Sequence, residues 1–433
     1  IIAWAFLIVP INLDDSLSDS ASFGPSNSEG HPHDKFTFSD IFSVGEKHLY
    51  TDWIPSSPGA FGKLEGKKYS IFEYAADGVE ILKQSYEIPL PESVSDPFLL
   101  NFNVDGHGTS LLGVDRQKLW RHSFSASFFL WNAATGDISP LNEPGVTWQG
   151  AWLSPTAQHL AFVKDNSLYL MTLATRDSLL IQAGDPTHDT AFAGIPDWVY
   201  EEEVVASQPV LQWSPSGAML AFMSFNDTEV ADYYIEYVKE GEAYPKRREI
   251  RYPKPGFPNP SAQLSLLHLS SLQLQTVATH SSTSGYFSRL TWGLTAGGLE
   301  QLAYQSLTRD QRQWTLSLFS ASASASAVEE GEKMKGARRD NVIVMHAAPH
   351  GWISDGTGGD FVHPSSQWYY VLRQGLRVKE VVLCRMVGSF DCHVVSSPTM
   401  NVAEIVGFDC HRRLIVVAAH VGASAHRQLC LSK

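Results

Sequence analysis

The sequence predicts an all-β protein with the architecture of a β-propeller. Short apolar runs alternate with turn residues, as at 69–74, 98–104 and 167–173, which is typical of short antiparallel strands. No long stretch has helical periodicity, while 12 Trp and many Leu and Val residues favour strands. A third observation, an internal repeat, separates a propeller from other all-β architectures.

The repeat is a nine-residue pattern at 154–162 that recurs at 214–222. Both copies begin Ser-Pro and end Leu-Ala-Phe, Trp152 and Trp213 stand just before them, and Trp292 precedes a looser third copy. A turn between two strands cannot bury both of its faces alone, so we expect units of about four antiparallel strands to stack around a centre. An immunoglobulin-like sandwich is the alternative, and the repeat disfavours it.

The first residues differ in composition from the rest of the chain. Residues 1–9 are apolar but too few to span a bilayer, which takes about twenty. Because the chain begins with Ile, we interpret 1–13 as the remnant of a signal-anchor or signal segment, with a buried strand as the alternative. Residues 14–34, rich in Ser, Gly, Pro and Asp, are expected to form a flexible stalk, and 35–433 the propeller.

Net charge and cysteine spacing exclude several classes of function. The formal net charge of −14 argues against a nucleic-acid partner, which would need a basic surface, and it weakly favours cationic ligands. The four Cys residues include no Cys-x-x-Cys pair, so neither a zinc site nor a thioredoxin-like site is predicted. We expect no cofactor and no metal.

The most informative stretch is 195–204, in which three glutamates follow Asp-Trp-Val-Tyr. Asp197 after a proline predicts a helix N-cap, and the apolar flank indicates that this short helix packs against protein. We expect Glu201, Glu202 and Glu203 near its C-terminal end, where the negative end of the helix dipole makes carboxylates unfavourable unless a cation joins them. Such a site could capture an ammonium group, although a glutamate run by itself is usually a solvated face.

Residues 197–204 resemble the glutamate motif of the dipeptidyl peptidase IV family, Asp-Trp-Val-Tyr-Glu-Glu-Glu-Val, without a gap. The resemblance implies that Glu202 and Glu203 bind the free amino terminus of a peptide substrate. Residues 120–128 resemble the family segment Trp-Arg-His-Ser-(aromatic)-x-Ala-x-(aromatic). There the arginine, here Arg121, is implied to bind the substrate's backbone carbonyl and to hold a nearby glutamate.

The same resemblance extends to features outside the two motifs. It implies a disulfide between Cys384 and Cys392, whereas Cys410 and Cys430 are left open as a second bridge or free thiols. Asn226 begins the sequon Asn-Asp-Thr, so glycosylation and passage through the secretory pathway are expected. The Tyr-rich region 233–252 is implied to help build a homodimer.

The sequence contains no Gly-x-Ser-x-Gly motif, on which a serine nucleophile of this family would stand. The α/β-hydrolase domain that carries the catalytic triad is therefore expected to be absent, and the chain to be inactive alone. We expect about six to seven blades of an eight-bladed family fold, either a fragment or a truncated gene product.

The function implied is the substrate-selecting propeller of a serine dipeptidyl aminopeptidase that releases X-Pro or X-Ala dipeptides from peptide N-termini. The implied location is a single-pass type II membrane protein with its propeller in the extracellular space or a vacuolar or secretory lumen, with secretion as the alternative. A non-catalytic relative that acts as an accessory or protein-binding subunit is the alternative function. A WD-type module is disfavoured because its Gly-His and Trp-Asp signature is missing.

Overall fold

The computed structural model describes the chain from Thr51 to Ser432, with gaps. The described residues are 51–53, 60–74, 80–94, 97–101, 108–208, 210–238, 241, 243–294, 298–320, 339–346, 351–353, 358–361, 368–374, 379–385, 391–396, 400–409, 414–421 and 428–432. The segment expected at 1–13, the stalk at 14–34 and Cys410 lie outside the described residues. Within the described part, no helix combines the length and apolarity that a membrane span requires.

The chain divides into two compact units, residues 1–90 and residues 91–433. The first unit holds one four-stranded antiparallel sheet in sequence order, with Phe61 and Tyr69 buried. Its strands are β1 (Thr51–Trp53), β2 (Ala60–Glu65), β3 (Lys68–Tyr74) and β4 (Glu80–Glu87).

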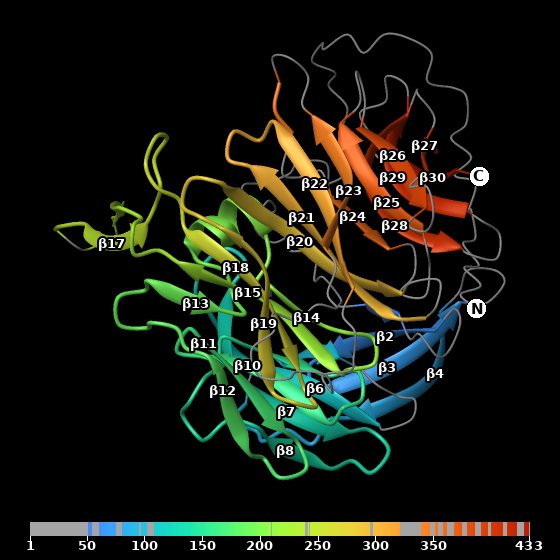
Figure 1. The fold of residues 1–433 in the computed structure, drawn as a ribbon. Helices are drawn as coiled ribbons and strands as arrows, with labels where there is room; N and C mark the ends of the chain where they lie inside the picture. Colours follow the sequence, from blue (N-terminus) through green and yellow to red (C-terminus); the bar gives the residue numbers. More distant parts are fainter. Residues whose placement is uncertain are drawn as a thin grey trace, which may run out of the picture. The chain divides into compact units, whose positions relative to one another are not determined.

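In the described part of the second unit, six further sheets are antiparallel and each comes from one continuous region of the chain (Figure 1). The first two contain β5 (Phe98–Asn101), β6 (Thr109–Lys118), β7 (Phe124–Asn132) and β8 (Ile138–Pro140), then β9 (Gly150–Leu153), β10 (His159–Lys164), β11 (Ser167–Thr172) and β12 (Ser178–Gln182). The third contains β13 (Ala191–Ala193), β14 (Leu211–Trp213), β15 (Met219–Asn226), β18 (Ser261–His268) and β19 (Gln273–His280).

The remaining sheets follow in the same manner. They contain β20 (Gly285–Leu294), β21 (Glu300–Thr308), β22 (Gln313–Ser320) and β23 (Arg339–His346), then β24 (Gly358–Phe361), β25 (Trp368–Gln374), β26 (Lys379–Arg385) and β27 (Asp391–Val394), and last β28 (Met400–Asp409), β29 (Leu414–Val421) and β30 (Gln428–Ser432). A separate hairpin, β16 (Asp232–Tyr237) with β17 (Lys246–Arg251), is inserted between β15 and β18. With the sheet of the first unit, the described residues form seven blade-like sheets, which agrees with the predicted six to seven.

The hydrophobic core lies between successive sheets of the second unit. Leu111, Phe128 and Phe162 belong to one buried cluster shared by the sheets β5–β8 and β9–β12, and Leu168 and Phe222 to another shared by β9–β12 and β13–β19. A third cluster joins the sheet β13–β19 to β20–β22. A fourth cluster joins the sheet β20–β23 to β25 and β26. Because each inner sheet buries both of its faces against neighbours, the packing is that of propeller blades.

The two repeat copies adopt the same turn. Ser154 precedes β10 and Ser214 precedes β15, and each serine N–H donates to a carbonyl five residues on, at 2.8 and 2.9 Å. Each serine Oγ accepts a hydrogen bond from the backbone N–H of that same residue, His159 or Met219, at 3.1 and 3.2 Å. The fourth residue of each copy has a positive φ, +53° at Ala157 and +73° at Gly217, so the repeat predicted from sequence is confirmed as a repeated strand-turn-strand unit.

Tryptophans near the repeats connect neighbouring sheets. The indole N–H of Trp213 donates to the carbonyl of Trp152 at 3.1 Å, and that of Trp292 donates to the carbonyl of Gln212 at 3.2 Å. Both acceptors lie two residues before the serine of a repeat. Trp292 thus makes the same kind of link between sheets as Trp213, and it lies opposite Leu302 in the β20–β21 pair.

Cys384 in β26 and Cys392 in β27 lie opposite each other and form a disulfide. The pairing that the family resemblance implied is present. A disulfide across adjacent strands restricts the unfolded chain only through the short loop that it closes.

Replacing Phe162 by Ala should lower the free energy of unfolding by about 3–5 kcal/mol. Its ring is buried and stacks on Trp148 and Tyr169, with centroids 4.0 and 5.1 Å away. Urea unfolding followed by Trp fluorescence measures the change. Leu179→Ala on β12, where the side chain is 44% exposed, is the control and should cost less than about 0.5 kcal/mol. Equal effects of the two substitutions would contradict the packing between sheets.

Candidate functional site

The segment that precedes the three glutamates is capped by Asp197, as predicted. Asp197 Oδ2 accepts hydrogen bonds from the backbone N–H groups of Val199 at 3.0 Å and Tyr200 at 3.4 Å. The chain then forms the π-helix η1 (Tyr200–Val205), which ends at Ala206 in a left-handed conformation with φ of +50°. Isolated π-helical turns are rare and often occur at functional sites.

The position of the glutamates within this helix differs from the prediction. Glu201, Glu202 and Glu203 lie in the first turn of η1, so the expectation that they sit near its C-terminal end was wrong. The π-helical turn extends the helix past the acidic run to Val205. The unfavourable dipole field at a C-terminus therefore does not account for a cation here, and any affinity for one must come from the carboxylates themselves.

Two apolar residues anchor η1, which confirms that it packs against protein. Val199 and Tyr200 are buried, and the Tyr200 ring packs on Phe225 of β15 with centroids 4.3 Å apart. Its phenol oxygen accepts a hydrogen bond from the backbone N–H of Phe287 in β20 at 3.3 Å. Burial raises the pKa of Tyr200, so the phenol stays neutral and serves as a fixed support.

The three glutamates occupy three different environments. Glu201 is only 2% exposed, and its Oε1 accepts a hydrogen bond from the backbone N–H of His122 at 2.8 Å. Glu202 Oε1 lies 2.8 Å from Arg121 Nη1, with the Glu202 side chain 16% exposed. Glu203 is exposed. Of the three glutamates, it is the one that matches the solvated position usual for a glutamate run.

Arg121 lies in the loop 119–123 between β6 and β7. Ser123 closes this loop, because its carbonyl accepts a hydrogen bond from Leu119 N–H and its Oγ accepts one from Trp120 N–H. The Trp120 ring contacts Trp198 edge-on with centroids 6.3 Å apart. The Arg121 side chain is 70% exposed beyond its ion pair, so most of its N–H donors face solvent.

A second basic residue, Arg248, also contacts this loop. The Arg248 guanidinium of β17 lies 3.4 Å from the centroid of the Trp120 ring, and Arg248 Nη2 donates to the Leu119 carbonyl at 3.4 Å. Sequence reasoning predicted Arg121 and Glu202 together but missed Glu201, Trp120 and Arg248. Trp120 stood inside the matched motif, whereas Arg248 carried no sequence signal.

A cavity of about 450 Å³ adjoins this cluster. Its walls include five Asp or Glu residues, two Arg residues and three Trp or Phe rings. They are Asp189, Glu201, Asp227, Asp232, Glu249, Arg248, Arg251, Trp120, Phe192 and Trp198. Neither Arg121 nor Glu202 nor Glu203 lines it, so the predicted substrate-binding residues lie outside this cavity. Among the described residues, no group of His, Cys, Asp and Glu is arranged to hold a metal ion.

Two buried aspartates lie at the base of η1 and at the end of β15. Asp197 and Asp227 are each 1% exposed, and the Oδ1 atom of each has no hydrogen-bond partner among the described residues. Burial raises the pKa of Asp197 to about 7, although backbone hydrogen bonds from Val199 and Tyr200 oppose the shift. Burial and the nearby Asp197 carboxyl raise the pKa of Asp227 to about 10, so Asp227 is neutral at physiological pH.

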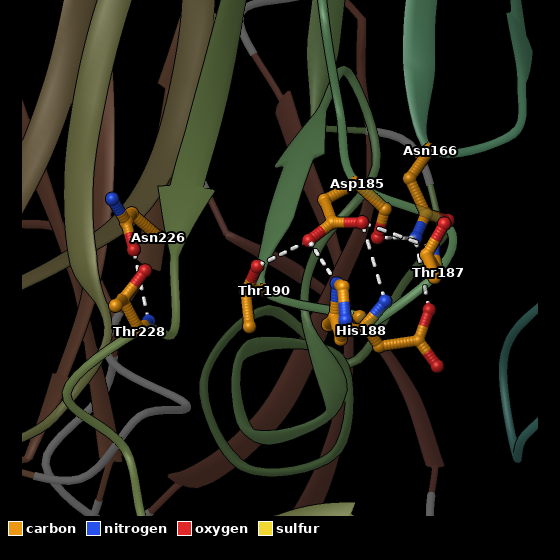
Figure 2. Close-up of polar contacts among 8 residues, drawn as sticks. Asn166, Asp185, Thr187, His188, Thr190, Asn226 and Thr228 are labelled. Carbon is orange, nitrogen blue, oxygen red and sulfur yellow. Dashed lines mark hydrogen bonds and ion pairs between the residues drawn. The ribbon is translucent and has the colours of Figure 1, made fainter.

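The turn between β12 and β13 contributes Thr187, His188 and Asp189 to the lining of the cavity, and Figure 2 shows the polar contacts within this turn. Asp185 accepts hydrogen bonds from Thr190 Oγ1 at 2.7 Å and from the backbone N–H groups of Thr187 and His188. These bonds, that of Thr190 first, lower the pKa of Asp185 to about 2. Asn166 Nδ2 donates to Asp189 Oδ1 at 3.0 Å and so ties this turn to the loop between β10 and β11.

The sequon residue Asn226 is exposed at the end of β15. Its Oδ1 accepts a hydrogen bond from the backbone N–H of Thr228 at 2.9 Å (Figure 2). The side chain is therefore accessible in a local turn that brings the two polar residues of the sequon together.

Asp227→Asn should make the stability of the protein less dependent on pH, because the parent protein becomes less stable as the pH rises and the Asn side chain does not titrate. The pKa of Asp227 is raised from 3.8 to about 10 in the folded state, so the folded state binds this proton more tightly than the unfolded state. The free energy of unfolding that this proton contributes is fully present below pH 3.8 and is lost as the pH rises toward the folded-state pKa. The loss is on the order of 1 kcal/mol per pH unit. Melting temperatures from pH 5 to pH 8 should fall less steeply in the variant. The exposed control Asp177→Asn should follow the parent protein, and an unchanged slope in Asp227→Asn would contradict the assignment.

Comparisons with known proteins place this arrangement in a family. Residues 106–429 match the model of the dipeptidyl peptidase IV (DPP IV) N-terminal region, which is more than half of the chain. A probable dipeptidyl-aminopeptidase B from Metarhizium robertsii is 39% identical over 174 residues, which cover 37% of this chain and 19% of that protein. The dipeptidyl peptidase 4 of Trichophyton tonsurans is 30% identical over 273 residues, covering 60% of this chain and 34% of that protein.

Human prolyl endopeptidase FAP is 30% identical over 319 residues, which cover 67% of this chain and 38% of that protein. The chain thus spans less than two fifths of the length of these curated relatives. The crystal structure of Porphyromonas gingivalis dipeptidyl peptidase 4 matches the fold with a TM-score of 0.72 at 18% identity, over 91% of this chain and 53% of that one. The chain therefore belongs to the dipeptidyl peptidase IV family and corresponds to its N-terminal propeller region.

Proposed function

We propose that this chain recognises the free amino terminus of peptides on behalf of a serine-type dipeptidyl aminopeptidase. The ion pair between Arg121 and Glu202, beside the exposed Glu203, is the observation that carries the proposal. Two adjacent carboxylates and a largely exposed guanidinium offer an acceptor set for an ammonium group and a donor set for a carbonyl oxygen. Relatives named dipeptidyl peptidases support peptides as the substrate class.

The strength of the ammonium contact follows from simple electrostatics. A peptide α-amine has a pKa of about 8, so it is mostly charged at neutral pH. At 4 Å, one ammonium–carboxylate contact has a Coulomb energy of about 1 kcal/mol in water and about 4 kcal/mol at an effective dielectric of 20. Desolvation reduces the net gain, so two carboxylates on one ammonium give a firm but reversible hold.

A fixed amino terminus determines which peptide bond is cut. Each extended residue spans at most about 3.5 Å, so the distance from the Glu202–Glu203 pair to a nucleophile selects one bond along the substrate. We propose cleavage after the second residue, Pro or Ala. The nucleophile would belong to an α/β-hydrolase domain in which Ser, His and Asp perform acyl transfer.

Arg121 has two tasks in this proposal. Its Nη1 holds Glu202 in place at 2.8 Å, which reduces the entropy that the carboxylate loses when it binds an ammonium. Its remaining donors are available to the substrate's first carbonyl. Loss of Arg121 would therefore weaken substrate binding twice, through a lost contact and a less ordered Glu202.

The β16–β17 hairpin supports a second candidate function, the binding of a protein partner. Its exposed large side chains are Tyr233, Tyr234, Tyr237, Val238 and Tyr244, with Val238 86% and Tyr244 85% exposed. Aromatic residues are enriched at protein interfaces. We propose that this hairpin contributes to a homodimer, and in a non-catalytic relative the same surface would serve an accessory role.

Passage through the secretory pathway, with the propeller outside the cytosol, is also part of the proposal. The exposed Asn226 sequon and the Cys384–Cys392 disulfide support it, because disulfides persist in oxidising compartments. Anchoring by a single N-terminal membrane segment remains a proposal from the sequence alone.

Glu202→Gln together with Glu203→Gln should raise the KM for Ala-Pro-p-nitroanilide at least 100-fold in the full-length enzyme, because the ammonium loses both counter-charges. Hydrolysis is followed at 405 nm. Glu143→Gln, on an exposed turn, is the matched control and should leave KM unchanged. Turnover of the double variant at the parent rate and KM would refute recognition of the amino terminus by this pair.

Asn226→Gln should abolish an N-linked glycan when the protein is expressed in a eukaryotic secretory host. The expected result is a loss of the mobility shift that a glycan-removing amidase produces in the parent protein. Thr228→Ala removes the same acceptor sequence and should behave identically. A glycan that persists in both variants would rule out Asn226 as the acceptor.

A further inference from the structure

We propose that Glu201, the first glutamate of the triplet, is a positioning residue that orients Arg121 through the backbone of the next residue. The inference rests on the proposed function, since it concerns the same site. Its basis is one contact: Glu201 is 2% exposed, and its Oε1 accepts the N–H of His122 at 2.8 Å across 79 residues of chain.

Glu201 cannot be a third ligand for the peptide amine. Although Glu201 lines the cavity, its side chain is only 2% exposed and has almost no surface to offer to a solvated ammonium group. A carboxylate is costly to bury unless its oxygens are hydrogen-bonded, and a carboxylate bonded to a backbone N–H makes a strong, short hydrogen bond. The hydrogen bond from His122 N–H therefore accounts for the burial of Glu201.

Two consecutive contacts join η1 to the loop 119–123. The Glu201–His122 hydrogen bond and the Glu202–Arg121 ion pair are both 2.8 Å long and involve neighbouring residues on each side. Because His122 directly follows Arg121, a fixed His122 N–H determines where the Arg121 Cα lies relative to Glu202. Arg121 itself is 70% exposed, so its own side chain has little packing to keep it in place.

The rest of the loop is held independently of Glu201. Trp120 contacts both Trp198 and Arg248, and Ser123 closes the turn. Loss of the Glu201 contact should therefore release the Arg121–His122 end without unfolding the loop. This separation makes a positioning role distinguishable from a purely structural one.

The test uses two uncharged variants of similar size, Glu201→Gln and Glu201→Met. Glutamine keeps an oxygen that can accept from His122 N–H, whereas methionine keeps the volume but offers no comparable acceptor. In the full-length enzyme with Ala-Pro-p-nitroanilide, Glu201→Met should raise KM at least tenfold with kcat within about threefold of the parent. Glu201→Gln should stay within threefold of the parent in both constants.

A double substitution tests whether Glu201 acts through Arg121. In an Arg121→Ala background, Glu201→Met should raise KM less than twofold further, because the side chain that it positions is gone. Hydrogen exchange of the peptide that spans 119–123 should be faster in Glu201→Met than in Glu201→Gln, while the melting temperatures of the two variants agree. Exchange and melting can be measured without any catalytic activity.

Each outcome decides the inference. A KM rise shared by Glu201→Gln and Glu201→Met would overturn it in favour of a charge effect, and a rise that persists in full without Arg121 would overturn it in favour of another route. A parent-like Glu201→Met with parent-like exchange at 119–123 would also overturn it. Failure of the proposed function is separately visible, because Glu202→Gln with Glu203→Gln would then leave KM unchanged.

Discussion

The contact between η1 and the loop 119–123 joins segments that are 79 residues apart in the chain. The loop comes from the sheet β5–β8, and η1 follows β13, so two non-adjacent sheets must hold their places before Arg121 and Glu202 can meet at 2.8 Å. The buried clusters between successive sheets provide that rigidity. The site is therefore a property of the stacked blades, and its geometry depends on packing far from the charged residues.

Buried acids distinguish this region from the rest of the described chain. Glu201, Asp197 and Asp227 are each at most 2% exposed, and each raises the free energy of the folded state unless hydrogen bonds compensate. Asp197 is compensated in part by the hydrogen bonds that its Oδ2 accepts from Val199 and Tyr200 N–H, and Glu201 by its bond to His122 N–H. Asp227 avoids the cost by staying protonated at neutral pH.

The blades were predictable because their signals are local. The Ser-Pro turn at 154 and 214 encodes its own hydrogen bonds, whereas the meeting of Arg121 with a glutamate was implied by the resemblance of two motifs to the family. The helix end was not predictable, because Tyr200 at the start of η1 is held by residues distant in sequence: its ring packs on Phe225 and its phenol oxygen accepts the N–H of Phe287. Arg248 was missed for the same reason: its partner Trp120 lies on a distant strand connection.

The triplet of glutamates follows from helix geometry. Successive side chains on a helix with 3.6 residues per turn point about 100° apart, and the angle is smaller in a π-helical turn, which has more residues per turn, but three consecutive side chains still spread over about half of the helix circumference. Three consecutive residues therefore cannot share one face. Glu201 is buried and accepts a backbone N–H, Glu202 is partly exposed and pairs with Arg121, and Glu203 is exposed. One residue type thus fills three different positions. Glutamate suits all three because its carboxylate can accept a backbone N–H, pair with a guanidinium or remain hydrated.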